Sequence, residues 1–504
     1  MKSTYIILSF ALSAVLFGSS CKKFLDQDPN SEASDQTTWK SENDANASVA
    51  ACYSLIRSAF NAAITYYSYG DLVSGEFTDV PGGDGAYRDV MNYNWGFGVP
   101  AANTYDPRLK LRLYSNFYTA ITQSNRCLYF IGNMPVAVFA GSDDATKQAA
   151  KNHYLGEAYF TRAFNYFYIS RVWGDVPLVT TYSDSAVTAS VARTPQADVL
   201  KQAIADTKQA LLYLNWKQDG SPDMAVRADK GAAFALLAHI YAWMGDYENC
   251  NQACDSVINS GTYHYLDAGS YMNIYKGQSP ESIFEISQNA TAESMRATDV
   301  YSITGVTLVP PYINNGASQP AWQLDNGLID YLYSDTNDVR YNKALVKITT
   351  GGGNTYESIK YANIQNVNNS TANQIALNNI IVFRLADIQL LKAEALTAKA
   401  APDYGAAMAI VNDLRMVRGA EALPLVTGTD LLNTIIDERG RELFLEGHRT
   451  FDLIRLERLT HEQQFGYISP AEFAAGKYYW PVDPTLFSTN TKLTQTPFWI
   501  GKMK

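Results

Sequence analysis

The clearest periodic pattern of the chain lies between Arg227 and Ser260. Its first half spaces apolar residues three, four and seven positions apart, which places them on one face of an α-helix. These residues are Phe234, Leu237, Ala238 and Tyr241. Gly245-Asp246 interrupts the pattern, and a second apolar face follows with Cys250, Cys254 and Val257. The segment predicts two helices joined by a tight turn, with both cysteines acting as small buried side chains.

Three weaker copies of this pattern occur elsewhere. The predicted pairs are Glu42–Phe60 with Ser115–Ile131, His153–Trp173 with Thr194–Leu214, and Ile380–Lys399 with Tyr404–Arg418. The bulky, small and tyrosine positions of Arg227–Ser260 resemble a tetratricopeptide repeat, whose period is about 34 residues. One pair alone leaves an apolar face uncovered, so the pairs have to stack on each other. We therefore expect a mostly α fold.

Two long segments between the predicted pairs lack helical periodicity. They are Asn61–Asp106 and Gly261–Ile375. Within the second, short strands are predicted at Ile283–Ser287 and Ala344–Ile348. Long excursions from a compact body are usually functional or disordered. The many aromatic residues of these two excursions favour function.

The first residues have the layout of a secretory signal. Lys2 is followed by an apolar stretch from Tyr5 to Phe17 and then by small residues, the order of a signal peptide. The stretch is shorter than the roughly 20 apolar residues that span a bilayer. Cys21 comes directly after the small residues and resembles the lipidated cysteine of bacterial lipoproteins, although Gly18 stands where that motif usually has Leu. We expect a signal peptide at residues 1–20, a lipidated flexible tether at 21–41 and a single domain at 42–504.

Net charge and composition exclude several classes of protein. The chain carries a formal charge of −10, which becomes −11 when Lys2 is removed with the signal. Such an acidic surface repels nucleic acid, so no nucleic acid partner is expected. Hydrophobic residues make up 47% and charged residues 18% of the chain, as in a folded protein with a large core. The cysteines have no partners at metal-ligand spacing, and no motif indicates a metal or a cofactor.

The densest charge cluster runs from Asp437 to Asp452. Glu438, Glu442 and Glu446 are four residues apart and share one helix face. Two carboxyl groups flanking a sugar are what glycoside hydrolysis requires. The interleaved arginines, however, depress carboxyl pKa values, whereas a general acid needs a raised pKa. A structural arginine–carboxylate network is the favoured interpretation, and no nucleophile elbow or phosphate loop is present. We expect a protein that is not an enzyme.

Carbohydrate binding is the chemistry that the two excursions favour. A sugar offers an apolar face for an aromatic ring and a rim of hydroxyls for amide, carboxylate or guanidinium groups. The candidate ligand-binding residues are Tyr66, Tyr67, Asp71, Arg88, Tyr93, Asn94 and Trp95 in the first excursion, and Tyr312, Asn314 and Trp322 in the second. The alternative is that Trp95 and Trp322 pack their excursions onto the helices, because most large aromatic residues are mainly buried.

Several segments taken together resemble the SusD/RagB family of nutrient-binding lipoproteins. The segments that carry the resemblance are Lys22-Lys23-Phe24-Leu25-Asp26, Glu157–Ala163, Trp173–Leu178, Ala228–Ala238, Arg384–Asp387 with Ala393-Glu394-Ala395, Glu438–Arg455 and Tyr478–Val482. They occur in the family's order and extend over nearly the whole chain. The tail departs from the family pattern, reading Ser488-Thr489-Asn490-Thr491 and Gln495-Thr496-Pro497-Phe498 where an Asn-Pro and a Gln-Asn-Pro-Gly turn are usual.

The resemblance implies a fold and a role. The fold is a SusD-like α-helical body of about four tetratricopeptide-like helix pairs with long irregular loops and a few short strands, whose halves are residues 42–260 and 261–504. The role is capture of an extracellular nutrient, foremost an oligo- or polysaccharide, at the outer membrane. There the protein is lipid-anchored, faces the cell exterior, and delivers its ligand to a SusC-like TonB-dependent barrel transporter. A peptide or other nutrient as ligand, a surface glycoside hydrolase and a structural scaffold remain as alternatives.

Overall fold

The computed structural model describes residues 38–78, 85–95, 106–182, 190–217, 219–289, 293–350 and 353–503, and the structural statements below refer to these residues. The predicted signal peptide, Cys21 and the tether up to residue 37 lie outside them and stay predictions. In the described part of the chain, no helix combines the length and the apolar character needed to cross a membrane.

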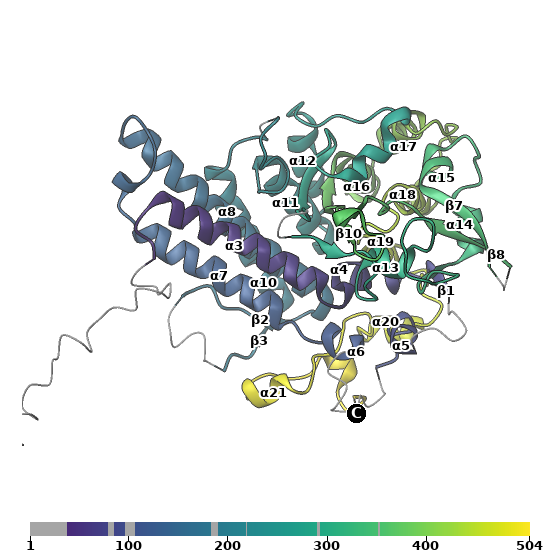
Figure 1. The fold of residues 1–504 in the computed structure, drawn as a ribbon, viewed down its shortest axis with the longest axis horizontal. Coiled ribbons are helices and arrows are strands. Elements are labelled where there is room, and N and C mark those ends of the chain that lie inside the picture. The colour runs from purple at the N-terminus through teal and green to yellow at the C-terminus, as the bar shows by residue number, and fades with distance from the viewer. Residues whose placement is uncertain are drawn as a thin grey trace, which may run out of the picture.

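A row of helices forms the body, and each helix packs on the next (Figure 1). In chain order they are α3 (Glu42–Asn61), α7 (Ser115–Asn133), α8 (Asp144–Trp173), α10 (Gln196–Tyr213), α11 (Lys230–Met244), α12 (Tyr247–Ile258), α16 (Leu385–Ala398), α17 (Tyr404–Val417) and α18 (Gly428–Glu442). The four predicted pairs are therefore confirmed as α3 with α7, α8 with α10, α11 with α12, and α16 with α17. The mostly α fold is confirmed with them.

Local sequence explains where these helices begin and end. Asp143, Asp229 and Asp246 each accept a hydrogen bond from the backbone N–H three residues further on and so cap α8, α11 and α12. Gly245 ends α11 with a φ of 78°, in the left-handed region that glycine adopts most easily. The predicted break at Gly245-Asp246 is confirmed.

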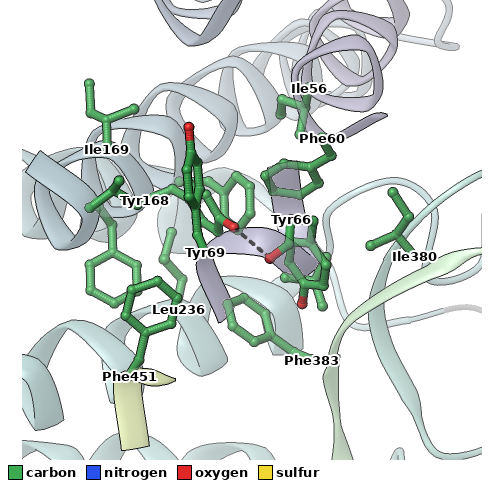
Figure 2. Close-up of a cluster of buried hydrophobic side chains, with 14 of the residues drawn as sticks. Ile56, Phe60, Tyr66, Tyr69, Tyr168, Ile169, Leu236, Ile380, Phe383 and Phe451 are labelled. Atoms are coloured by element: carbon green, nitrogen blue, oxygen red, sulfur yellow. Dashed lines mark hydrogen bonds between the residues drawn. The ribbon is translucent and has the colours of Figure 1, made fainter. Parts of the chain in front are cut away.

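The central core joins segments that are far apart in the sequence (Figure 2). Phe60 of α3 lies with its ring centroid 4.9 Å from that of Tyr168 on α8 and 4.7 Å from that of Tyr66. The Tyr168 hydroxyl donates to the Tyr66 carbonyl at 3.4 Å. Phe383 and Phe451 complete this core from the C-terminal half. The two halves of the chain therefore share one hydrophobic core.

The cysteines pack as small buried side chains. Cys52 of α3 and Cys127 of α7 have their Sγ atoms 3.9 Å apart, and both are fully buried. Cys250 and Cys254 are fully buried in α12. All four are free thiols, and the predicted packing role of Cys250 and Cys254 is confirmed.

Short antiparallel strand pairs connect the irregular segments. The pairs are β1 (Phe77–Thr78) with β6 (Gln323–Leu324), β2 (Val176–Pro177) with β3 (Arg193–Thr194), β4 (Ser282–Ile286) with β11 (Ile380–Arg384), β7 (Leu345–Thr350) with β8 (Gly353–Ser358), and β10 (Gln374–Ala376) with both β5 (Met295–Arg296) and β9 (Ile364–Asn366). The strands predicted near Ile283 and Ile348 are confirmed. The helix predicted from Ile380 is wrong over its first five residues, which form β11, because this apolar, β-branched run pairs with β4.

The long segments without helical period contain short helices that periodicity does not reveal. They are α4 (Thr65–Tyr67), α5 (Gly85–Met91), α13 (Ile303–Thr307), α14 (Asn326–Leu332) and α15 (Val339–Ala344), and a further short helix, α6 (Pro107–Leu111), follows directly after the first segment. After α18 the chain adds α19 (Arg449–Thr460), α20 (Pro470–Ala474) and α21 (Leu486–Thr489). A π-helical turn, Ser68–Leu72, follows α4 and packs on α19.

Two glycines allow this π-helical turn to touch the segment before α19. A Cβ atom added to Gly70 would lie 2.2 Å from the carbonyl oxygen of Gly447, and one added to Gly447 would lie 2.4 Å from the ring of Tyr66. Both contacts are far below van der Waals distance. The first excursion can therefore reach the C-terminal half only with glycine at these positions.

We expect Gly70→Ala to lower the free energy of unfolding by about 2 kcal/mol or more, since the added methyl group meets backbone that cannot move aside. Gly132→Ala is the matched control, because Gly132 is exposed on α7 with nothing within 4 Å of an added Cβ. That change should be neutral or stabilise by roughly 0.5–1 kcal/mol. Urea unfolding of both variants measures the difference. Equal stabilities would show that the contact between Gly70 and Gly447 is not close.

Candidate functional site

The two excursions meet and form one surface. In the β1–β6 pair, Phe77 lies opposite Leu324 and Thr78 opposite Gln323. The Asp325 N–H donates to the Glu76 carbonyl at 2.8 Å. The Trp322 ring of the second excursion contacts two rings of the first, Phe77 and Tyr87, each at a centroid distance of 5.4 Å. The segments that were predicted to carry the ligand are thus side by side.

Six of the ten predicted ligand-binding side chains are buried, each at most 4% exposed. They are Tyr66, Tyr67, Asp71, Tyr93, Trp95 and Trp322. In this structure none of them is accessible to a solute, so the prediction that they contact the ligand is corrected. The alternative, in which Trp95 and Trp322 pack their excursions onto the body, is the one that the structure supports.

Each of these side chains has a partner that accounts for its burial. The Tyr66 hydroxyl shares its one proton between the carbonyl oxygens of Ile381 and Glu446, at 2.9 and 2.8 Å. The Trp95 ring lies 4.8 Å from the ring of Trp480, and the Tyr67 ring lies 5.4 Å from that of Tyr361. Irregular segments without helical or sheet faces have to bury their large side chains to stay in place.

Two buried carboxyl groups lie beneath the joined excursions. Asp71 accepts a hydrogen bond from the Gly447 N–H at 2.8 Å. Burial raises the pKa of Asp71 well above its usual value, and the neighbouring Glu76 carboxylate adds to the rise. Burial likewise raises the pKa of Glu76 to about 7, although Arg449 opposes it. Both carboxyl groups are therefore buried beneath the excursions and are not part of the exposed surface.

The other four predicted residues lie wholly or partly at the surface of the excursions. Arg88 and Asn94 are exposed at and just beyond α5, Asn314 is exposed, and Tyr312 is half-buried. The Asn314 backbone N–H donates to Gln374 Oε1 at 2.6 Å, which leaves its side-chain amide outside that contact. We call Arg88, Asn94, Tyr312 and Asn314 the excursion surface. A cavity beside the excursions, lined in part by Tyr67, has a volume of about 10 Å³, enough for one water molecule.

The charge cluster around Glu442 is a closed network. Arg384 and Arg418 contact Glu442 Oε1 at 2.6 and 2.9 Å, and Arg340 contacts Oε2 at 3.1 Å. Burial alone would raise the pKa of Glu442, yet the three guanidinium groups hold it well below its usual value. A carboxyl group in this state cannot serve as a general acid.

The neighbouring carboxylates are engaged in the same way. Glu438 pairs with Arg340 at 2.7 Å, and Glu446 pairs with Arg384 at 2.7 Å and with Lys360 at 3.0 Å. All three glutamates are fully buried. The structure supports the interpretation of this cluster as a structural network. Its partners Arg340 and Lys360 come from the second excursion, where no pattern in the sequence identifies them.

One group within the described ranges brings together side chains that can ligate a metal: His239, Asp387 and His448. The Asp387 carboxylate is already bound at both oxygens, by His239 Nε2 at 2.7 Å and by Arg439 at 2.9 Å. Burial lowers the pKa of both histidines, and Arg439 lowers them further. The rings of His239 and His448 stack at 5.6 Å. This arrangement fits a buried packing role, and the prediction that no metal is bound stays a prediction.

A larger cavity lies elsewhere, along α7. It has a volume of about 530 Å³, within the range of ligand-binding pockets. It is lined by Leu55, Tyr114, Ser115, Tyr118, Thr119, Ile121, Thr122, Gln123, Arg126, Pro177, Val179, Val191, Leu486, Thr489, Asn490 and Leu493. We call it the α7 groove. Sequence reasoning missed it because four separate segments form its walls.

A row of stacked helix pairs that holds two joined excursions defines a class of protein: a helical-repeat scaffold with long irregular insertions. Comparison with known proteins identifies the family. A model of the SusD family matches residues 305–499, and a model described as starch-binding associating with outer membrane matches residues 23–242. The chain belongs to the SusD/RagB family, as the sequence resemblance predicts.

Individual relatives extend over nearly the whole chain. A SusD-like protein of Formosa agariphila is 28% identical over 495 residues, which cover 87% of this chain and 88% of the relative. A crystallised SusD homolog from Bacteroides thetaiotaomicron is 27% identical, with a TM-score of 0.77 and coverage of 92% of this chain and 99% of the homolog. A laminarin-binding SusD-like protein shares the fold, with a TM-score of 0.67 at 21% identity, over 91% of this chain and 99% of that protein.

We expect Trp322→Ala to lower the free energy of unfolding by about 3–5 kcal/mol, because it leaves a cavity between the excursions. Tyr312→Ala is the matched control on the same excursion and should change stability by less than about 1 kcal/mol, since its ring is half-buried. Urea unfolding followed by tryptophan fluorescence and by circular dichroism measures both variants. An unchanged midpoint for Trp322→Ala would show that the ring is not part of the core.

Proposed function

We propose that this protein is a non-catalytic binder of an extracellular nutrient, an oligo- or polysaccharide, and that it delivers this ligand to a TonB-dependent transporter in the outer membrane. The observation that carries the proposal is the match of both halves of the chain to SusD-family models, one of them described as starch-binding. The laminarin-binding protein of the same fold supports a glycan as ligand.

The excursion surface has the chemistry that a glycan needs. Tyr312 offers part of an aromatic ring for the apolar face of a sugar, while Arg88, Asn94 and Asn314 offer donors and acceptors for hydroxyl groups. Because the larger aromatic rings are buried, we propose that the ligand binds along an open surface mainly through polar contacts. A glycan of several sugar units fits such a surface, because each unit adds contacts.

The charges of this protein support binding without hydrolysis. Glycosidases use a carboxyl group with a raised pKa next to a second carboxylate. Glu438, Glu442 and Glu446 are buried and hydrogen-bonded to arginines, so no glycosidic bond can lie between them. Of the described acids with raised pKa, Asp71 and Glu76 are fully buried as well.

The place of action that we propose is the outer membrane. The family model for residues 23–242 is described as associating with that membrane. A lipid on Cys21 would supply the anchor, because buried acyl methylene groups each contribute about 0.8 kcal/mol. We further propose that the domain faces the cell exterior, where it can meet a polysaccharide before the transporter does.

We expect the lipid-free protein to bind soluble laminarin or starch in affinity gels and in calorimetric titrations. A combined Tyr312→Ala and Asn314→Ala variant should bind roughly ten-fold or more weakly, since one stacking contact and one hydrogen bond are each worth about 1 kcal/mol. Tyr129→Ala, at an exposed tyrosine on α7, is the matched control and should bind normally. Release of reducing sugar, or binding of peptides with no binding of any glycan tested, would contradict the proposal.

We expect Cys21→Ser to move the protein from the membrane fraction to the soluble fraction when the chain is expressed with its own signal. The reason is that a serine hydroxyl does not accept the thioether-linked lipid. Radioactive palmitate incorporated by the parent and absent from the variant would report the lipid directly. Ser20→Ala should leave the parent's location unchanged. A Cys21→Ser protein that stays in the outer membrane would show that something other than this lipid holds it there.

A further inference from the structure

The α7 groove has an apolar wall, and a buried hydroxyl group lies in that wall. The apolar side chains are Leu55, Ile121, Pro177, Val179, Val191, Leu486 and Leu493, together with the rings of Tyr114 and Tyr118. Tyr114 is only 6% exposed, and its hydroxyl has no hydrogen-bond partner among the described residues. The Tyr118 hydroxyl, by contrast, donates to the Pro177 carbonyl at 2.5 Å. A buried hydroxyl without a partner costs free energy that a bound acceptor would recover.

The chain enters the described body next to this groove. Trp39 is buried and stacks on Phe130 of α7, with ring centroids 4.9 Å apart and planes 11° apart. Twelve residues of α7 separate Phe130 from Tyr118, which corresponds to about 18 Å along the helix. The groove therefore lies within reach of the residues that precede Trp39 in the chain.

The preceding segment has the length and composition to fill the groove. From Leu25 to Trp39 an extended chain spans up to about 45–50 Å, more than twice the distance needed. Phe24 and Leu25 are the two large apolar residues between Lys22 and Thr38, with Lys22 and Lys23 before them and Asp26 and Asp28 after them. Among the described residues that line the groove, Arg126 is the charged one. The family match begins at residue 23, so this segment belongs to the sequence that characterises the family.

We propose that the α7 groove is the docking site of the chain's own N-terminal segment, with Phe24 and Leu25 inserted between α7 and the Pro177–Val179 wall. The Tyr114 hydroxyl donates to a backbone carbonyl of the inserted segment. This inference does not depend on the proposed sugar binding.

Docking would fix the distance between the lipid and the body. With the segment free, eighteen residues separate Cys21 from Trp39 and span up to about 60 Å. With Phe24 docked, the free part shortens to three residues, or about 10 Å. The docked state holds the α7 side of the body close to the membrane surface, while the undocked state allows a larger distance between them.

The test is hydrogen–deuterium exchange of the mature chain, residues 21–504, made lipid-free by Cys21→Ser. We expect the backbone amides of residues 24–28 to exchange at least about ten-fold more slowly than an unstructured peptide of the same sequence, as docked segments do. A combined Phe24→Ser and Leu25→Ser variant should remove this protection. Thr122→Trp, which fills the groove, should remove it as well, while exchange in the helical core stays unchanged.

A conservative pair of variants tests the hydrogen bond. Tyr114→Phe should reduce the protection of residues 24–28, whereas Tyr129→Phe, on the same helix outside the groove lining, should not. Exchange of residues 24–28 at the unstructured rate in the parent would overturn the proposal. Protection that survives Thr122→Trp would place the segment on another surface and overturn it equally. If added laminarin instead protects residues 115–126 while residues 24–28 exchange freely, the groove is a sugar site and the proposal is wrong.

Discussion

The buried pairing of Glu442 with three arginines is the interaction on which the arrangement of this protein depends. Arg384 stands where β11 becomes α16, Arg418 follows α17, and Arg340 lies on α15. Their guanidinium groups meet on one carboxylate at the end of α18. Removing these charges from water carries a cost that only close, complete pairing offsets. The network therefore permits one relative placement of the last helix pair, the β4–β11 sheet and the second excursion.

That placement decides what the excursions can present. Glu446 belongs to the same network, and its carbonyl accepts the hydroxyl of Tyr66, while the next residue, Gly447, binds Asp71. The first excursion is thus attached to the arginine–carboxylate network through buried contacts. The second excursion is attached to the first through β1, β6 and Trp322. The outer polar surface is the part of the excursions that a ligand can reach. Its residues can differ without disturbing the buried network beneath it.

The sequence predicts the helix pairs well because their signals are local. The apolar spacing around Phe234, the break at Gly245-Asp246 and the small buried cysteines each follow from neighbouring residues, and each is confirmed. The sequence wrongly predicts a helix for Ile380–Arg384, because a short apolar run has the same appearance in a helix and in a buried strand. Only its partner β4, about a hundred residues earlier in the chain, distinguishes the two.

The candidate site was harder to predict because exposure is not a local property. Trp95 and Trp322 have the residue type and the loop position of a sugar platform, yet Trp480 covers one, and Phe77 and Tyr87 cover the other. No periodicity in these segments shows which side chain faces inward. An excursion of this length carries its own small core, so its largest rings are the first to be buried and its smaller polar residues stay outside. Ligand recognition is therefore better sought in residues such as Tyr312 and Asn314, which the packing of the excursions leaves at the surface.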